Sequence, residues 1–493
     1  MLLRRYLRQC RTIGINRVAH LHSRVSRRSY AVVASSLQEK NSNAAFDEEI
    51  DVLIVGSGGA GLAAALRCNA LSLSSLVVEK TDKIGGTTAL SGGGMWIPNN
   101  LYSKARGDND SIENALTYMN HCIGNVGLAS SPERRIAFLE NAPRMLEFLK
   151  EQGYQGCASG QYPNYYPQLP GGEVPRCVED VVFDARKIGS WFNLVRQGPL
   201  MPPVYTDEVG RPFKSATLLS NMIYAATIVK AGDMGDAIQV GGGVDAQLAL
   251  MDDAWWGPSV IDPVTGQRFF LLFERGLPHS IIVDSSGKRF MNEAESYTDA
   301  GQAMYRRNRD VAAIPAWIIL DSNHRKRYLF TTMPPRFIPK SALKSGFIVK
   351  SNTLEDLANQ IGVNPQDLND TVQRFGDMAR RGIDDDFGRG GNVYDQFFAD
   401  PKVKPNGSLG PIEKAPFYAV KVWPGDLGTK GGLLKDENAQ VVGKSSKPIP
   451  GLYAAGNTTA SVMGRCYPGP GSTLGPALTF SFIAVNHMAK NNI

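Results

Sequence analysis

The chain has 493 residues, of which 43% are hydrophobic and 20% are charged, and this predicts two or three folded domains. The composition excludes a disordered chain and a disulfide-stapled miniprotein. The net charge of +6 comes from residues 1–30, which hold eight Arg and no acidic residue, whereas the rest has 45 basic and 47 acidic residues. We therefore expect no nucleic-acid partner. No run of about 18 apolar residues occurs, so we also expect no integral membrane segment.

The N-terminal segment predicts targeting. Residues 1–30 interleave Arg and Ser with Leu, Ile and Val, without the continuous apolar stretch of a secretory signal. This pattern is typical of a mitochondrial transit peptide, and a disordered basic tail is the alternative. Arg28 lies three residues before a predicted cleavage at Ala31. We expect residues 31–46 to form a linker and the mature protein to lie in the mitochondrial matrix.

The folded part opens with a dinucleotide-binding pattern. Residues 50–55 predict a buried strand, a GxGxxG turn and a helix follow, and residues 75–78 predict a second strand that ends at Glu79. Such glycines allow a tight turn and a close approach of the pyrophosphate, the helix N-terminus attracts phosphate, and the acid binds ribose hydroxyls. We assign the following residues to cofactor binding: Gly56, Ser57, Gly58, Ala60, Gly61, Glu79 and Lys80.

A glycine-dense loop, residues 83–100, follows Glu79 and favours FAD over NAD. Its glycines let backbone amides approach a large planar ligand, and its hydroxyls can bind a diphosphate or a ring edge. The apolar residues 95–97 require burial, which argues against a flexible linker. In this loop we assign to cofactor binding Gly86, Thr87, Thr88, Ser91, Gly92 and Gly93.

Helix-start signals are clear outside these motifs. Ser131 followed by Pro132 predicts a helix start, and Pro143 predicts an interruption of that helix. Thr353 predicts the start of a helix that ends near Gly362. A further helix is predicted to begin at residues 364–365. The six Cys and six His show neither a CxxC nor an HExxH pattern, so we expect no metal site and reduced thiols.

Together with residues 428–432 and 449–457, these motifs resemble the flavoproteins related to fumarate reductase and the 3-ketosteroid dehydrogenases. The resemblance implies an α/β fold, in which a Rossmann-like FAD-binding domain (47–258 and 429–493) is interrupted by a smaller α+β catalytic domain (259–428). It assigns Gly456 and Asn457 to FAD. It also implies a non-covalent FAD, because relatives that attach the flavin use a His that this chain lacks at residues 85–87.

Residues 467–471 read Tyr-Pro-Gly-Pro-Gly and resemble a segment typical of 3-ketosteroid Δ1-dehydrogenases. The prolines and glycines predict a rigid loop that allows close backbone approach. Ser472 or Thr473 can cap the helix that follows. The resemblance implies that the Tyr467 hydroxyl and the Gly471 N–H bind a ketone oxygen. We also assign Ser472 and Leu474 to cofactor binding.

Two further tyrosines complete the predicted site. Tyr297 occupies the position at which fumarate reductases carry a proton-delivering Arg. Residues 162–167 resemble a Tyr-rich segment of the ketosteroid dehydrogenases whose second Tyr, here Tyr166, lines the active site. The resemblance implies that Tyr297 removes a proton from the substrate and that Tyr166 assists it.

The implied activity is desaturation of a 3-ketosteroid, or a similar cyclic ketone, at C1–C2. FAD would accept the hydride, and the next electron acceptor stays open between a quinone, oxygen and a carrier. One alternative is a fumarate reductase-like reduction of an enone or a dicarboxylate, against which the absence of Arg at position 297 argues. Another is a redox-inactive flavin-binding protein.

Overall fold

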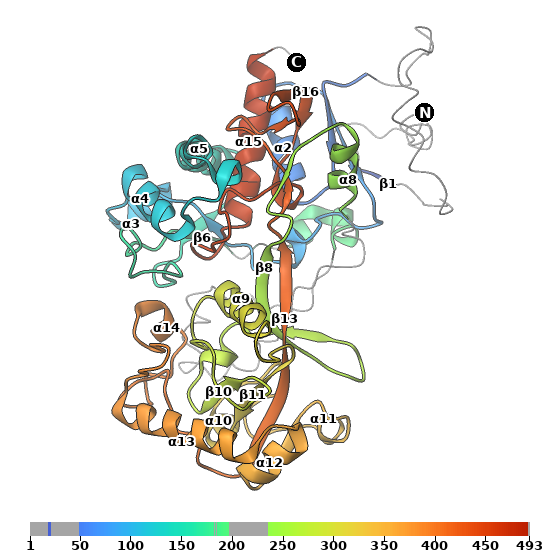
Figure 1. Cartoon of the computed structure of the whole chain (residues 1–493). Coiled ribbons are helices and arrows are strands. Elements are labelled where there is room, and N and C mark those ends of the chain that lie inside the picture. The colour runs from blue at the N-terminus through green and yellow to red at the C-terminus, as the bar shows by residue number, and fades with distance from the viewer. Residues whose placement is uncertain (1–17, 21–48, 182, 184, 197–234, 492–493) are drawn as a thin grey trace.

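The computed structural model describes residues 18–20, 49–181, 183, 185–196 and 235–491, and it has a mixed helix and sheet fold. Figure 1 shows two regions. The terminal region contains elements from both ends of the chain, and the central region comprises residues 254–429.

The terminal region is built on a parallel βαβ unit, as the sequence predicts. Strands β2 (Val52–Val55) and β3 (Ser75–Glu79) pair in parallel, and helix α2 (Gly59–Ala70) connects them. Strand β1 (Val18–His20) pairs in parallel with the other edge of β3. Alternate residues of β2 are buried because one face of this sheet packs on helices.

The C-terminal helix α15 (Leu474–Lys490) returns the chain to this unit and packs on α2 and on α5 (Pro132–Glu151). Ser131 caps α5 by accepting a hydrogen bond from the Arg134 N–H, as predicted. The predicted interruption at Pro143 is wrong, because α5 continues through it. Nine residues of α5 are buried, and this packing outweighs the backbone hydrogen bond that a proline removes.

Shorter elements complete the terminal region, and the predicted burial of residues 95–97 is confirmed. The elements are η1 (Thr88–Leu90), β4 (Met95–Trp96), α3 (Leu101–Arg106), α4 (Ile112–Ile123), η2 (Gly127–Ser130), β5 (Gly156–Ala158), β6 (Cys177–Asp180), η3 (Ala185–Asn193), α8 (Asp236–Gly243), β7 (Leu248–Ala249), β14 (Gly432–Leu433), β15 (Gln440–Val442), β16 (Pro448–Tyr453) and η5 (Gly456–Thr458).

An antiparallel sheet forms the central region, with the strand order β10-β11-β13-β8-β9 and with β12 also paired to β13. Strand β13 (Phe417–Thr429) is long enough to pair with β11 and β12 at one end and with β8 (Ala254–Ile261) at the other. Figure 1 shows β8 and β13 running together toward the terminal region. The predicted domain boundaries at 258/259 and 428/429 therefore fall within paired strands.

Helices surround this sheet. Two predicted helices are confirmed: α12 (Leu354–Ile361), which Thr353 caps and Gly362 ends in a left-handed conformation, and α13 (Pro365–Arg381). The other elements are β9 (Arg268–Phe270), η4 (Glu274–Gly276), β10 (Ser280–Val283), α9 (Tyr297–Arg307), β11 (Ala316–Leu320), α10 (Ser322–Arg327), α11 (Lys340–Lys344), β12 (Val349–Ser351) and α14 (Val393–Phe397). Within the described residues, no helix combines the length and the apolar character needed to cross a membrane.

Candidate active site

Glu79, the last residue of β3, lies at the end of the predicted site that would bind the nucleotide. Its carboxylate accepts hydrogen bonds from the Ser57 N–H at 3.0 Å, the Ser57 hydroxyl at 2.6 Å and the Thr81 N–H at 3.0 Å. Burial opposes ionisation of Glu79, but these hydrogen bonds outweigh it and hold the pKa of the carboxyl below its usual value. Glu79 is thus an ionised acceptor at the carboxyl end of β3, as a ribose-binding acid requires.

The N-terminus of α2 is suited to a pyrophosphate. Gly58 is its N-cap and supplies no side-chain cap, and the Gly59 N–H binds the Thr88 hydroxyl oxygen at 3.0 Å. A Cβ at Gly61 would lie 2.0 Å from the Gly56 carbonyl oxygen, so only glycine permits this helix to start so close to β2. The positive end of the helix dipole and the uncapped amides fit an anionic diphosphate.

The glycine-dense loop folds over that helix end. Gly86 has a positive φ of 54°, and a Cβ there would lie 3.1 Å from the Gly58 Cα. Ser91 bonds within the loop, to the Thr88 carbonyl oxygen and the Gly93 N–H. The other predicted loop residues are Thr87, at the N-cap of η1, and Gly92, which faces open space. Lys80 lies apart, since its exposed ammonium pairs with Asp236 at 2.7 Å.

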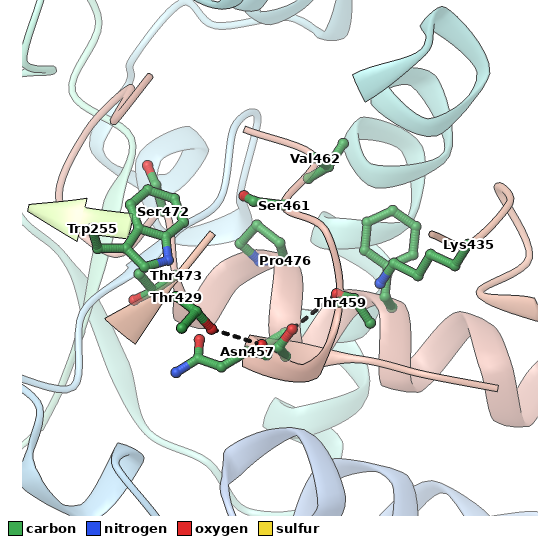
Figure 2. Close-up of a pocket in the computed structure, with 13 residues that line it drawn as sticks. Trp255, Thr429, Lys435, Asn457, Thr459, Ser461, Val462, Ser472, Thr473 and Pro476 are labelled. Carbon is green, nitrogen blue, oxygen red and sulfur yellow. Dashed lines mark hydrogen bonds between the residues drawn. The ribbon is translucent and has the colours of Figure 1, made fainter. Parts of the chain in front are cut away.

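A small pocket lies along the first turns of α15 (Figure 2). Gly456, Asn457 and Ser472 line it, so three of the predicted cofactor residues meet here. A Cβ at Gly456 would lie 3.3 Å from the Ala60 Cβ, which places η5 against the start of α2. The pocket therefore lies next to the start of α2. Leu474, the first residue of α15, is not among the lining residues.

The predicted capping of α15 by Ser472 or Thr473 is wrong. Thr473 occupies the N-cap position but makes no capping hydrogen bond. The Ser472 hydroxyl instead donates to the Gly469 carbonyl oxygen at 2.6 Å and accepts from the Gly469 N–H at 3.1 Å. Ser472 thus bonds within the loop of residues 467–472, which we call the Pro-Gly loop, and the first turn of α15 receives no side-chain cap.

Three buried tyrosines, which we call the phenol cluster, meet between the two regions: Tyr165, Tyr297 and Tyr467. Each is at most 5% exposed. The Tyr165 hydroxyl donates to the Tyr297 hydroxyl oxygen at 3.1 Å, and the Tyr297 and Tyr467 rings meet edge to face at 5.0 Å. The structure therefore brings together the two phenols that the sequence predicted from segments 170 residues apart.

Different elements supply the three phenols. Tyr297 is the first residue of α9, where a helix N-terminus favours negative charge. Tyr467 lies in the Pro-Gly loop. The Tyr165 N–H donates to the Pro468 carbonyl oxygen at 3.0 Å, and the Tyr118 hydroxyl donates to the same oxygen at 2.6 Å. The Tyr-rich segment is thus held on the Pro-Gly loop by backbone contacts.

Tyr166 points elsewhere. Its hydroxyl hydrogen-bonds Asp299, and burial together with that carboxylate raises the pKa of Tyr166 well above its usual value. The hydroxyl that reaches Tyr297 belongs to the preceding residue, Tyr165. The sequence offered no signal to choose between adjacent tyrosines, because the choice depends on how the loop docks on Pro468.

Gly471 lies in the Pro-Gly loop and packs against the backbone of β4. It has φ of 89°, and a Cβ there would lie 2.5 Å from the Trp96 nitrogen, so glycine is required. Its carbonyl oxygen accepts hydrogen bonds from the Trp96 and Gly475 N–H groups at 3.0 and 2.9 Å. Within the described part of the chain, its own N–H has no hydrogen-bond acceptor. This amide is therefore available to a ligand oxygen.

Burial dominates the protonation of the cluster. It raises the pKa of Tyr297 well above its usual value, with Tyr467 adding to the increase and the Tyr165 hydroxyl opposing it. It also raises the pKa of Tyr467, while hydrogen bonds with Tyr297 and Thr473 oppose the rise. Both phenols are neutral at pH 7, so Tyr467 is a hydrogen-bond donor and Tyr297 is a strong base once it has lost its proton.

Comparisons with known proteins agree with this arrangement. The model of the FAD binding domain family matches residues 51–196 and 206–474. A 3-oxosteroid 1-dehydrogenase of Mycobacterium tuberculosis is 36% identical, over 90% of this chain and 98% of its own. A 4-oxocyclohex-2-ene-1-carboxylate 5-dehydrogenase of Sinomonas cyclohexanicum is 32% identical, over 89% and 94%.

A solved structure is also similar along nearly the whole chain. The crystal structure of 3-ketosteroid delta1-dehydrogenase from Sterolibacterium denitrificans, in complex with 1,4-androstadiene-3,17-dione, has a TM-score of 0.82 and 33% identity. The similarity covers 90% of this chain and 99% of that one.

The predicted mitochondrial matrix location and transit peptide are wrong. The relatives are enzymes of bacteria, which have no mitochondria, and they match 90% of this chain. In addition, residues 18–20 of the predicted transit peptide form strand β1 on the edge of β3. The prediction failed because it rested on composition alone: an Arg-rich segment without acidic residues resembles a transit peptide even where it is not one.

These matches decide between the predicted alternatives in favour of a ketosteroid-dehydrogenase type of flavoprotein over a fumarate reductase type. The chain belongs to the FAD-binding family of 3-oxosteroid 1-dehydrogenases, which are FAD-dependent oxidoreductases that act on CH–CH groups.

Proposed function

We propose that the protein desaturates a 3-ketosteroid at C1–C2 and that the phenol cluster performs the proton chemistry. The observation that carries the proposal is the meeting of Tyr297 with Tyr467, which lies on a loop whose Gly471 N–H has no acceptor among the described residues. The dehydrogenases named above act on ring ketones. Such a reaction removes a hydride from C1 and a proton from C2, and C2–H is acidic only when the C3 oxygen is stabilised as it gains negative charge.

Tyr467 and Gly471 are the proposed donors to that C3 oxygen. The raised pKa of Tyr467, caused by burial, keeps its hydroxyl protonated, and the amide of Gly471 approaches from the same loop. Donors fixed before the reaction stabilise developing negative charge without reorganisation, and one such donor is worth about 3 kcal/mol.

Tyr297 is the proposed base for the C2 proton. Its ionised form would be stabilised by the hydrogen bond that Tyr165 donates and by the N-terminus of α9. We therefore assign to Tyr165 the assisting role that the sequence had assigned to Tyr166. Bound FAD would supply the hydride acceptor.

FAD would be held by the residues of the nucleotide end and the pocket. Glu79 would bind the ribose, the N-terminus of α2 the pyrophosphate, and Gly456 and Asn457 the part nearer the phenol cluster. We propose a non-covalent complex, since residues 85–87 contain no His. Acid denaturation should release the yellow cofactor, and colour retained on the precipitated protein would contradict this.

We propose the domain organisation that the family resemblance implies: a Rossmann-like FAD-binding domain from residues 47–258 and 429–493, and an inserted α+β catalytic domain over 259–428. The parallel βαβ unit and the return of α15 onto α2 support the first domain. The antiparallel sheet supports the second.

The test is anaerobic reduction of the FAD-loaded protein by androst-4-ene-3,17-dione, followed by mass spectrometry of the steroid. We expect the visible flavin absorbance to bleach and the 1,4-diene to form. Bleaching only with 4-oxocyclohexanecarboxylate would show that the substrate is a smaller ring ketone. No bleaching with either ketone would contradict the proposal.

A further inference from the structure

Lys430 is a buried cation to which the chemistry above gives no role. Its side chain is 0% exposed, in the turn between β13 and β14. Its ammonium donates a hydrogen bond to the Cys466 carbonyl oxygen at 2.9 Å and lies 4.0 Å from the nearer carboxylate oxygen of Asp253. Burial lowers the pKa of Lys430 to about 8, and Asp253 opposes the decrease.

Two contacts of the Lys430 ammonium connect it to Tyr467, one through the backbone and one through an aromatic ring. Cys466 directly precedes Tyr467, so the hydrogen bond restrains the backbone from which the phenol projects. The ammonium also lies 4.5 Å from the centre of the Trp255 ring. The Trp255 ring in turn meets the Tyr467 ring edge to face at 4.7 Å. One charged group therefore restrains the main chain before Tyr467 and an aromatic wall beside it.

Stability alone does not explain a lysine here. The Lys430 ammonium has three N–H donors, but among the described residues one acceptor, the Cys466 carbonyl oxygen, is within hydrogen-bond distance. Desolvating an ammonium is costly unless it is well paired, and a well-packed apolar side chain often stabilises such a position equally. A lysine over a tryptophan also occurs at Lys421 and Trp317, but that lysine is exposed and keeps its hydration.

We propose that Lys430 is a positioning residue, which holds the Tyr467 phenol in the orientation needed to bind the ketone oxygen. The inference rests on the proposed function, because that function assigns Tyr467 to binding the ketone oxygen. It extends that function to a residue that touches neither the substrate nor a reacting atom. The contact with Cys466 fixes the loop, and the contact with Trp255 fixes the ring.

The test compares Lys430→Met with Lys421→Met, a matched change at the exposed pair. Misplacing a catalytic group costs up to about 100-fold, so we expect Lys430→Met to lower kcat about 10- to 100-fold with KM within about threefold of wild type. Lys421→Met should leave both constants unchanged. Wild-type kcat in Lys430→Met, or an equal loss in both variants, would overturn the inference.

A second readout does not depend on the substrate. In FAD-loaded protein that contains 3-fluorotyrosine, the ¹⁹F resonance of Tyr467, identified by its absence in Tyr467→Phe, should shift or broaden in Lys430→Met and not in Lys421→Met. An unchanged resonance overturns the positioning role. If the wild-type protein shows no steroid-dependent bleaching but the resonance moves, the proposed function is contradicted, whereas the restraint of Tyr467 by Lys430 is confirmed.

If Lys430→Met does not bind FAD, the comparison is made with Lys430→Gln, whose amide is neutral and still offers an N–H donor toward Cys466. We expect a partial loss of kcat and a smaller change of the Tyr467 resonance. Wild-type kcat with an unchanged resonance in Lys430→Gln would then overturn the inference.

Discussion

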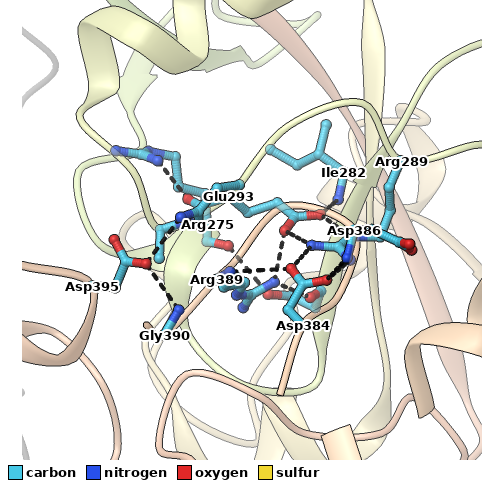
Figure 3. A network of polar contacts seen from close by, with 12 residues as sticks. Arg275, Ile282, Arg289, Glu293, Asp384, Asp386, Arg389, Gly390 and Asp395 are labelled. Carbon is cyan, nitrogen blue, oxygen red and sulfur yellow. Dashed lines mark hydrogen bonds and ion pairs between the residues drawn. The ribbon is translucent and has the colours of Figure 1, made fainter. Parts of the chain in front are cut away.

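Two buried polar clusters of this protein differ in how their charges are balanced. The charge network (Arg289, Glu293, Asp384 and Arg389; Figure 3) joins four ionised side chains, with Arg289 bridging Glu293 at 2.7 Å and Asp384 at 2.8 Å, and Arg389 reaching Glu293 at 3.1 Å. The phenol cluster contains no ion. Its hydroxyls bond to one another, and burial keeps them protonated.

We infer from this difference that the charge network is a structural support, which we call the frame, and that the phenol cluster is the reactive site. Because its charges are paired, the network holds the pKa values of Glu293 and Asp384 below their usual range, so neither carboxylate is available as an acid or base near neutral pH. Arg275, beside the network, hydrogen-bonds the carbonyl oxygens of Glu293 and Glu295 and so fixes the backbone that leads to Tyr297. The network and Arg275 therefore hold the backbone that precedes a phenol kept protonated by burial.

The largest expected effect is that of Tyr297→Phe, which removes the base and keeps the ring. We expect flavin reduction by the steroid to fall by about 10³-fold or more, at the upper part of the range for a general base, with FAD binding unchanged. The measurement is single-turnover bleaching. Tyr394→Phe is the matched control, since the buried Tyr394 hydroxyl has no partner among the described residues and its ring lies 4.7 Å from Tyr165. Equal rates in Tyr297→Phe and the control would remove Tyr297 from the chemistry.

Next comes Arg289→Met, which breaks the frame without touching a phenol. It leaves Glu293 and Asp384 buried without their bridging cation, so we expect a loss of about 3–5 kcal/mol in the free energy of unfolding. Chemical denaturation measures it. Arg374→Met removes an exposed ion pair with Asp386 and should cost less than about 1 kcal/mol. Similar losses in the two variants would show that the network is not a frame.

A smaller loss is expected for Tyr467→Phe, which removes one of two proposed donors to the ketone oxygen. With the Gly471 amide still in place, kcat/KM should fall by about 10²-fold, corresponding to about 3 kcal/mol. Steady-state assays with the steroid measure it. A variant with wild-type kcat/KM would show that the ketone oxygen is bound elsewhere.

The smallest effect distinguishes neighbouring tyrosines. Tyr165→Phe removes the donor to the Tyr297 oxygen and should slow flavin reduction about tenfold, as expected for a hydrogen bond to a charged group. Tyr166→Phe leaves that hydrogen bond intact, and its cost should appear in stability, because Asp299 loses a buried donor. The reverse order of rates would restore the original assignment to Tyr166.

Local signals predicted the terminal region well. A strand, glycines, a helix and an acid in sequence order determine a βαβ unit, and a cap such as Ser131 acts on its own helix. The continuation of α5 through Pro143 was not predictable in this way, because it depends on packing against α15 and α4.

The site was predictable in part for the same reason. Tyr297 and Tyr467 stand in motifs, whereas the choice of Tyr165 over Tyr166 depends on a backbone hydrogen bond to Pro468, about 300 residues away. Two further contacts also join distant segments: the ion pair of Arg289 with Asp384 and the hydrogen bond of Lys430 to Cys466. No periodic pattern in the sequence predicts either contact.

The central claim is that Tyr297 acts as its phenolate, and the pH dependence of flavin reduction tests it most directly. Burial raises the pKa of Tyr297, so its ionised fraction grows with pH throughout the neutral and mildly alkaline range. In single-turnover experiments between about pH 7 and 10, we expect the wild-type rate to rise about tenfold per pH unit and the residual rate of Tyr297→Phe to stay flat. A flat wild-type profile, or the same slope in both proteins, would contradict the account.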